Sequence, residues 1–338
     1  MADVVLTGIT KRFGATLAVD SVDLAVPDGA FVVLLGPTGA GKTTTLRLIA
    51  GLERPDAGHI RIGTQDVTAE TPAARDVAMV FQQYSLYPHL SVRDNLAFPL
   101  KSPLRPHSPS EIERKVREVA EMLRIGAKLD NRATELSGGE MQRVSIGRAL
   151  VRAPSIYLMD EPLSSLDAKL RADLRVELKR IQAELGATML YVTHDQIEAM
   201  TMATHVGVLD QGRLVQFGSP RDVYEDPNSL YVAARLGLPR INIANADLFD
   251  AMPVPPGTMK LGLRPENIVI GAEHPHAVPA TVARIERLGD QTRLHLRIED
   301  LDLVTLTDPH TSIAPGERIP VAPSDPLFFN LDGQRIRN

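Results

Sequence analysis

The chain contains no cysteine, which excludes disulfide bonds and thiolate metal sites. It also lacks any continuous apolar run of about 18 residues, so we expect no membrane-spanning segment. The N-terminal segment has no basic stretch followed by an apolar core, and we expect no secretory signal. Basic residues are not in excess, because the formal net charge is -5. Since nucleic-acid-binding domains usually carry a strongly basic face, nucleic acid is not an expected partner.

The 338 residues are enough for roughly two domains at about 150 residues each. Within residues 1–235, short apolar runs alternate with segments of helical periodicity, a pattern typical of a largely parallel α/β sheet. Nearly continuous apolar runs are typical of strands that are covered on both faces. We expect buried strands at 31–35, 77–81, 156–160, 188–192 and 206–210.

Two amphipathic helices are expected in this first domain. Ser110 and Glu113 form an S-x-x-E capping signature, and apolar residues follow at helical spacing from 112 to 123. Leucines and an isoleucine at helical spacing from Leu166 to Leu185 indicate the second helix. The proline-containing segment 101–110 predicts a loop, and a helical subdomain is expected over roughly 84–155.

The pattern changes in residues 236–338, where helical periodicity ends after a proline-rich segment. Segments 292–299 and 302–307 alternate apolar and polar residues, as half-exposed strands do, and 259–270 predicts a strand, a turn and a strand. Several short strands separated by glycine and proline favour a small all-β domain of the OB type.

A glycine-rich motif, GPTGAGKT, follows the expected strand 31–35 and precedes a helical segment. Glycines let backbone N–H groups turn inward around phosphate, and the helix N-terminus adds positive charge. Lys42 is expected to reach the β- and γ-phosphates, Thr43 to supply an oxygen to Mg²⁺, and Thr44 to bond the α-phosphate. The motif predicts a nucleotide-binding site formed by Gly36, Pro37, Thr38, Gly39, Ala40, Gly41, Lys42, Thr43 and Thr44.

Two adjacent carboxylates end the expected strand 156–160, in the sequence IYLMDE. Ligands of open α/β sheets gather at the carboxyl ends of strands, and paired buried carboxylates need a cation nearby. We expect Asp160 to lie on the Mg²⁺ side and Glu161 to act as general base for the attacking water. An acidic pair that only caps a helix is the alternative.

The run LSGGEMQRV at 136–144 lies between these two motifs, and with them it resembles the ATPase subunits of ABC transporters. The resemblance covers the whole first domain. It implies a P-loop NTPase fold with a RecA-like core and a helical subdomain. By the same resemblance, Gln82 senses Mg²⁺ and the attacking water, His194 in YVTHDQIEAM is the switch histidine, and Asp167 in SSLD belongs to the D-loop. Phe13 stands where the family stacks an aromatic ring on adenine; a core phenylalanine is the alternative.

In this family the LSGG segment acts on the nucleotide held by a second protomer. Ser137, Gly138 and Gly139 would then donate to the γ-phosphate across a dimer interface, which closes with ATP and opens after hydrolysis. This chain departs from the family at Glu140, where glutamine is usual. A glutamate still accepts hydrogen bonds from ribose, but it adds negative charge near the triphosphate. We expect a homodimer, with a pair formed with a second ATPase as the alternative.

The motifs are most similar to ATPases of the maltose-importer type, and GLRPENI at 262–268 resembles a segment of their C-terminal OB-like (TOBE) regulatory domain. The resemblance implies uptake of a carbohydrate, glycoside or polyol at the cytoplasmic face of the inner membrane. The implied partners are two permease subunits and, indirectly, a periplasmic or extracellular solute-binding protein. Importers of polyamines, iron or sulfate share this plan, and an exporter or a non-transport ABC ATPase are further alternatives.

The permease is expected to dock on the groove around 82–90, where Tyr84, Leu86 and Tyr87 offer apolar anchors. Simple packing of these side chains in the core is the alternative.

Overall fold

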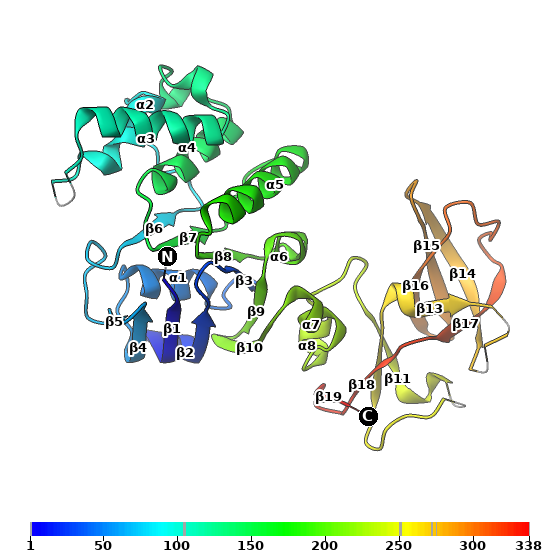
Figure 1. The fold of residues 1–338 in the computed structure, drawn as a ribbon. Coiled ribbons are helices and arrows are strands. Elements are labelled where there is room, and N and C mark those ends of the chain that lie inside the picture. The colour runs from blue at the N-terminus through cyan, green and yellow to red at the C-terminus, as the bar shows by residue number, and fades with distance from the viewer. Residues whose placement is uncertain (1, 104–105, 250–251, 272, 275, 338) are drawn as a thin grey trace. The chain divides into compact units, whose positions relative to one another are not determined.

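The computed structural model describes residues 2–103, 106–249, 252–271, 273–274 and 276–337, which form two compact units divided after Pro220 (Figure 1). The expected boundary at 235/236 lies inside the second unit. Two short helices precede it, α7 (Pro220–Glu225) and α8 (Leu230–Ala233). Ala233 of α8 belongs to an apolar cluster with Phe329 near the C-terminus, so this helix is part of the second unit's core.

The first unit is built on a six-stranded sheet with the order β10-β9-β3-β8-β7-β6. All neighbouring strands are parallel except β9 and β10. Each of the five expected strands is confirmed to within a residue at either end. These five are β3 (Phe31–Leu35), β6 (Val77–Val80), β7 (Ile156–Asp160), β8 (Met189–Thr193) and β9 (His205–Asp210). The sixth strand, β10 (Arg213–Gly218), completes the sheet.

A second sheet, antiparallel and with the order β2-β1-β4-β5, was not expected from the sequence. Its strands are β1 (Val4–Phe13), β2 (Thr16–Val26), β4 (Ala57–Ile62) and β5 (Gln65–Asp66). Pairing of β1 with β2 shifts register between Leu6 and Ile9 and again before Arg12. These irregularities break the period-two alternation that identifies a strand in sequence.

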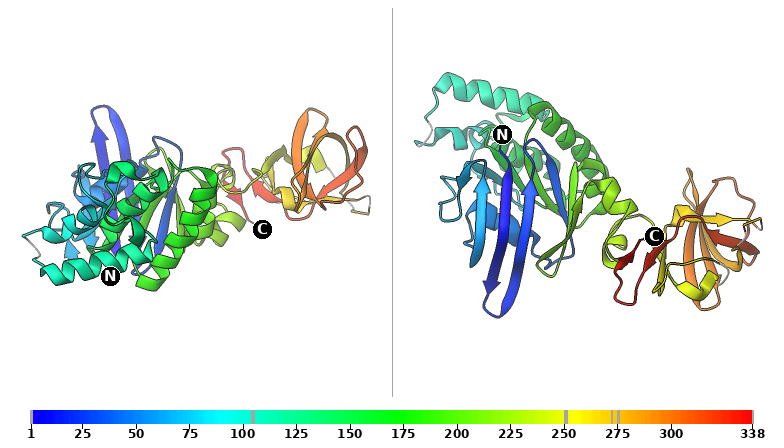
Figure 2. Two further views of the ribbon diagram at one scale, coloured as in Figure 1. Left: turned by 90° about the horizontal axis from the view of Figure 1, so that it is seen from above. Right: turned by 60° about the horizontal axis from the view of Figure 1, so that its bottom comes forward.

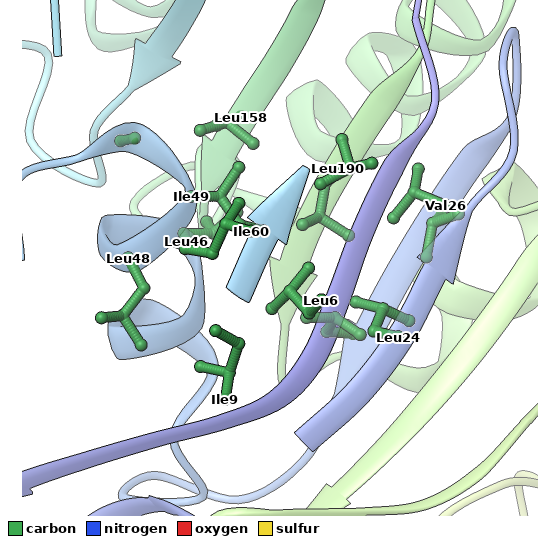
Figure 3. Close-up of a cluster of buried hydrophobic side chains, with 14 of the residues drawn as sticks. Leu6, Ile9, Leu24, Val26, Leu46, Leu48, Ile49, Ile60, Leu158 and Leu190 are labelled. Carbon is green, nitrogen blue, oxygen red and sulfur yellow. The ribbon is translucent and has the colours of Figure 1, made fainter. Parts of the chain in front are cut away.

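Helix α1 (Lys42–Ala50) contributes to the core that this sheet shares with the parallel sheet (Figure 3). Leu46 and Ile49 of the helix, Leu6 of β1 and Leu158 of β7 are buried in one cluster. The helix ends at Gly51, which has a φ of 76°. The buried Arg75 guanidinium donates to the carbonyls of Leu48 and Ile49 and so satisfies acceptors that the end of the helix leaves without an intrahelical partner. The core therefore fixes the helix whose first residues carry the phosphate-loop motif.

The helical subdomain lies on the other side of the parallel sheet from β1 and β2 (Figures 1 and 2). It contains α2 (Val92–Ala97), α3 (Pro109–Met122), α4 (Gly138–Leu150) and the short helices η1 (Phe98–Lys101), η2 (Gly126–Lys128) and η3 (Ala133–Glu135). The expected capping pair was wrong by two residues. Ser108 caps α3 with Glu111, because Pro109 fits the first helical turn, where its missing N–H costs nothing.

Helices α5 (Ala168–Leu185) and α6 (Gln196–Met202) complete the first unit. The long amphipathic helix begins after Asp167, so Leu166 lies outside it, contrary to expectation. Among the described residues, no helix is both long and apolar enough to cross a membrane.

The second unit is mostly β structure, as expected. One sheet has the order β11-β12-β18-β19 and the other β13-β17-β14-β15-β16. The elements are β11 (Asn242–Asn245), η4 (Ala246–Phe249), β12 (Lys260–Leu263), η5 (Pro265–Asn267), β13 (Ile268–Ile270), β14 (Val278–Arg287), β15 (Thr292–Ile298), β16 (Leu301–Thr307), β17 (Arg318–Pro323), β18 (Leu327–Phe329) and β19 (Arg335–Ile336).

Candidate nucleotide site

The phosphate-loop motif connects β3 to α1, as the sequence predicted. Gly41 has a φ of 96°, and a Cβ atom there would lie 2.5 Å from the Ala18 carbonyl oxygen. Gly39 also has a positive φ, of 83°, but has open space around it. Gly36 and Ala40 are buried, whereas Thr38 is exposed and Pro37 and Thr44 are partly exposed. The loop therefore needs glycine at position 41 for two reasons, its backbone conformation and its close approach to β2.

Lys42 is almost completely buried, with 5% of its surface exposed. Its ammonium donates to the carbonyl oxygens of Gly36 (2.9 Å) and Pro37 (3.0 Å) and lies 3.7 Å from Glu161 Oε1. Burial lowers the pKa of Lys42, and the Glu161 carboxylate opposes this shift. The loop thus holds a cation at its centre, as a site for phosphate requires.

Thr43 and Asp160 meet at the end of β7, where the Thr43 hydroxyl donates to Asp160 Oδ1 at 2.8 Å. Asp160 is 6% exposed, and burial raises its pKa, although the bond from Thr43 acts in the opposite direction. A hydroxyl and a carboxylate oxygen are ligands that Mg²⁺ prefers, and a cation would offset the cost of burying the charge. The residues present therefore fit a magnesium–nucleotide complex.

Glu161 and His194, which the sequence analysis names separately as expected catalytic residues, lie side by side in the structure. His194 Nδ1 lies 3.1 Å from Glu161 Oε2, so the two carboxylate oxygens face His194 on one side and Lys42 on the other. Glu161 has a φ of 43°, in the left-handed region that is costly for a side chain other than glycine. The Ser164 hydroxyl (2.8 Å) and backbone N–H (3.2 Å) both donate to its carbonyl oxygen and hold this turn. Strained backbone of this kind is often found at active sites.

Two expected nucleotide contacts lie at the surface. Gln82 is exposed on the segment after β6, and Phe13 is 46% exposed at the end of β1. The Lys11 ammonium lies 5.3 Å from the Phe13 ring centroid. The core alternative for Phe13 is therefore wrong, and the ring is accessible for stacking.

The signature segment begins α4, and Ser137 is its N-cap residue. Glu140 forms a capping box with it: the Ser137 backbone N–H and hydroxyl both donate to Glu140 Oε2, at 2.8 and 2.9 Å. These bonds lower the pKa of Glu140, the backbone bond most strongly. A Cβ atom at Gly139 would lie 2.2 Å from the Leu170 side chain, and one at Gly138 3.2 Å from the Tyr84 hydroxyl. Among the described residues, no hydrogen bond or ion pair joins this segment to the phosphate loop of the same chain.

Asp167 caps α5, since its carboxylate accepts from the Leu170 N–H at 3.0 Å. Just before it, Ser165 Oγ lies 3.2 Å from the Tyr84 hydroxyl, so the segment after β6 contacts the D-loop directly. Sequence reasoning named Tyr84 only as an anchor for the permease. The two positions are far apart in the chain, and no local pattern marks such a contact.

The sequence analysis also did not single out Glu198. It is 2% exposed on α6, and the hydroxyl of the fully buried Tyr191 donates to it at 2.9 Å. Burial raises the pKa of Glu198. Because α6 begins directly after His194 and Asp195, this buried bond between β8 and α6 fixes the segment that carries the histidine.

Comparison with known proteins agrees with this geometry. A family model described as ABC transporter matches residues 19–164, and a TOBE domain model matches 261–326. The sn-glycerol-3-phosphate import ATP-binding protein of Rhizobium etli is 45% identical over 316 residues, covering 91% of this chain and 90% of that protein. The chain belongs to the ATP-binding subunits of ABC transporters. It binds ATP, and its hydrolysis of ATP is coupled to transport.

Other members of the family match over similar lengths. The trehalose/maltose import ATP-binding protein of Thermococcus litoralis is 44% identical, with 90% of each chain covered. The xylose/arabinose import ATP-binding protein of Haloferax volcanii is 42% identical, with 100% of this chain and 96% of that protein covered. A solved dimeric ATP-binding cassette in a post-hydrolysis state, bound to ADP and phosphate, superimposes with a TM-score of 0.58 at 31% identity, covering 64% of this chain and 99% of that one.

Proposed function

We propose that this ATPase powers an importer for a carbohydrate, a glycoside or a polyol, including phosphorylated polyols. The relatives described above are named as import proteins for glycerol phosphate, trehalose or maltose, and xylose or arabinose. These solutes share a polyhydroxylated carbon chain. The observation that carries the catalytic part of the proposal is the convergence of Lys42, Asp160 and Glu161 at the carboxyl end of β7.

In the proposed reaction, the Lys42 ammonium leaves the loop carbonyls and binds the β- and γ-phosphates. Thr43 and Asp160 would hold Mg²⁺, which supplies charge neutralisation at the phosphates when bound. Glu161 accepts the proton of the attacking water, and His194 orients Glu161 through the 3.1 Å contact. Gln82 and Asp167 would approach the nucleotide when the dimer closes, and Phe13 would stack on the adenine.

A second copy of the chain would complete each site, because among the described residues no hydrogen bond or ion pair joins Ser137 to Glu140 with the phosphate loop of the same chain. Backbone N–H groups at the start of α4 would bind the γ-phosphate held by the partner. Closure then depends on ATP, and loss of the γ-phosphate opens the interface.

A shallow cavity of about 180 Å³ beside the segment after β6 supports the assignment of a permease-docking surface. Phe81 and Tyr84 line it, together with Arg148 of α4. Nearby, Tyr87 packs on the half-exposed Phe98, with ring centroids 4.4 Å apart. A short helix of one permease subunit would dock here on each copy of the ATPase and hold it at the cytoplasmic face of the membrane. Because Tyr84 also contacts Ser165, docking would be communicated to the D-loop.

Reconstitution with the permease pair and the solute-binding protein tests this proposal. The ATPase rate would be measured in vesicles with disaccharides, pentoses, glycerol phosphate, a polyamine and sulfate. We expect stimulation by one of the polyhydroxylated solutes. Stimulation by the polyamine or by sulfate alone would contradict the proposed solute class and leave the ATPase assignment intact.

A further inference from the structure

Glu140 places a carboxylate in the signature segment, beside the position proposed for the partner's triphosphate. Its carboxylate is 27% exposed and already accepts two hydrogen bonds from Ser137. Both bonds go to Oε2. A carboxylate is a stronger acceptor than an amide oxygen, so it competes with phosphate for the Ser137 hydroxyl. Glutamate at this position therefore has two unfavourable effects on nucleotide binding. It repels the triphosphate, and it retains the Ser137 hydroxyl as its own hydrogen-bond donor.

The other carboxylate oxygen has its own partner. Lys128, the last residue of η2, places its ammonium 3.2 Å from Glu140 Oε1. Lys128 is 42% exposed, and among the described residues Glu140 is its one ion-pair partner. The neighbouring carboxylate of Glu135 bonds instead to Asn131 and to the Arg132 N–H. The ammonium is thus directed at the carboxylate that distinguishes this signature.

We propose that Lys128 is a positioning residue of the signature, which neutralises Glu140 and so permits the partner's triphosphate to approach Ser137. The proposal rests on the composite site described under Proposed function. With the pair intact, the signature presents no net charge from these two side chains, as a signature with glutamine does. The ammonium also withdraws charge from the carboxylate and so weakens its hold on the Ser137 hydroxyl.

Charge balance makes a prediction that a structural role for Lys128 does not. Lys128→Gln leaves Glu140 unneutralised and should raise the ATP concentration needed for half-maximal dimer closure about three- to tenfold in dilute buffer. Lys128→Gln combined with Glu140→Gln should restore it to within about twofold of the wild type. The Lys128→Gln defect should also shrink above about 0.5 M salt, where the Debye length falls to a few ångströms.

The experiment uses the full chain in a Glu161→Gln background, which blocks turnover, and follows dimer formation by light scattering during ATP titration. Arg114→Gln is the matched control, because Arg114 forms an exposed ion pair with Glu118 on α3 of the same subdomain. Circular dichroism melts establish that each variant is folded. Equal behaviour of Lys128→Gln and the control would overturn the proposal, and so would a defect that Glu140→Gln does not repair.

A Ser137→Arg variant separates this inference from the function on which it rests. If Ser137→Arg abolishes dimer closure and Lys128→Gln has no effect on it, the composite site is supported and the proposed role of Lys128 is wrong. If Ser137→Arg still closes with ATP, the composite site itself is wrong, and the inference fails with it.

Discussion

Glu161 and His194 are joined across the ends of two neighbouring parallel strands, with 3.1 Å between a carboxylate oxygen and Nδ1. Glu161 follows β7 and His194 follows β8, and parallel pairing brings the two strand ends to one edge of the sheet. Lys42 approaches the other carboxylate oxygen from α1. The side chains proposed to be catalytic therefore owe their proximity to the order of strands in the sheet.

Glu161→Gln should lower ATP turnover by about 10²- to 10⁴-fold, because the amide keeps the shape but cannot accept the proton of water. ATP binding should persist, so the variant should accumulate as a nucleotide-bound dimer. Phosphate release gives the rate, and size-exclusion chromatography with ATP gives the dimer. Hydrolysis near the wild-type rate would rule out Glu161 as the base.

Lys42→Ala should weaken ATP binding by roughly 10- to 100-fold, the range for losing a hydrogen bond to a charged group. The buried ammonium is the cation at the centre of the loop, and its loss also leaves Glu161 without its neighbour at 3.7 Å. Calorimetric titration with ATP measures the effect. An unchanged affinity would contradict the assignment of the phosphate site.

Asp160→Asn should stabilise the nucleotide-free protein at pH 7 while it abolishes magnesium-dependent hydrolysis. Burial raises the pKa of Asp160 above its ordinary value of 3.8, so the folded state disfavours the ionised form relative to the unfolded state. The carboxylate therefore reduces stability at pH values above its folded-state pKa. This cost disappears as pH falls toward 3.8, where both states become protonated.

The corresponding measurement is the melting temperature of both proteins from pH 4 to pH 8 without nucleotide. The advantage of Asp160→Asn should be largest near neutrality and should decline in acid. If the melting-temperature advantage of Asp160→Asn grew as the pH fell, the pKa of Asp160 in the folded protein would be lowered and not raised.

Gly41→Ala should destabilise the protein more than Gly39→Ala. Both positions have positive φ, which costs a residue with a Cβ atom about 1–2 kcal/mol. At position 41 the new methyl would also lie 2.5 Å from a backbone oxygen of β2, which cannot move away cheaply. Urea unfolding of the pair measures the difference, and equal losses would mean that the contact with β2 relaxes without cost.

The sequence predicted the parallel sheet and most of the site because both depend on local signals. A continuous apolar run identifies β3, and the glycine motif directly after it identifies the phosphate loop. The antiparallel sheet was missed because register shifts in β1 break its alternation. The ion pair of Lys128 with Glu140 and the contact of Tyr84 with Ser165 were missed for another reason: the partners meet only through tertiary packing.

The capping box of α3 shows how a local signal can also mislead. Ser108 and Ser110 both begin an S-x-x-E sequence, and only Ser108 has proline after it. The structure uses Ser108, because proline fits the first turn of a helix. Glu113, the expected capping partner of Ser110, instead pairs with Arg93 of α2.

The composite site makes the sharpest prediction, since it separates this mechanism from that of a self-contained ATPase. Ser137→Arg and Glu161→Gln, carried on different protomers, should partly restore activity when mixed. One site of the mixed dimer would combine an intact Glu161 from one chain with an intact Ser137 from the other. The second site would carry both lesions. If the signature served the nucleotide of its own chain, every subunit would be inactive and mixing would restore nothing.

The ATPase rate of the mixture is therefore compared with each variant alone, after fluorescence transfer between labelled chains has confirmed exchange. A mixture no more active than its components would leave Ser137 as the cap of α4 alone, a role that its bonds with Glu140 already fulfil.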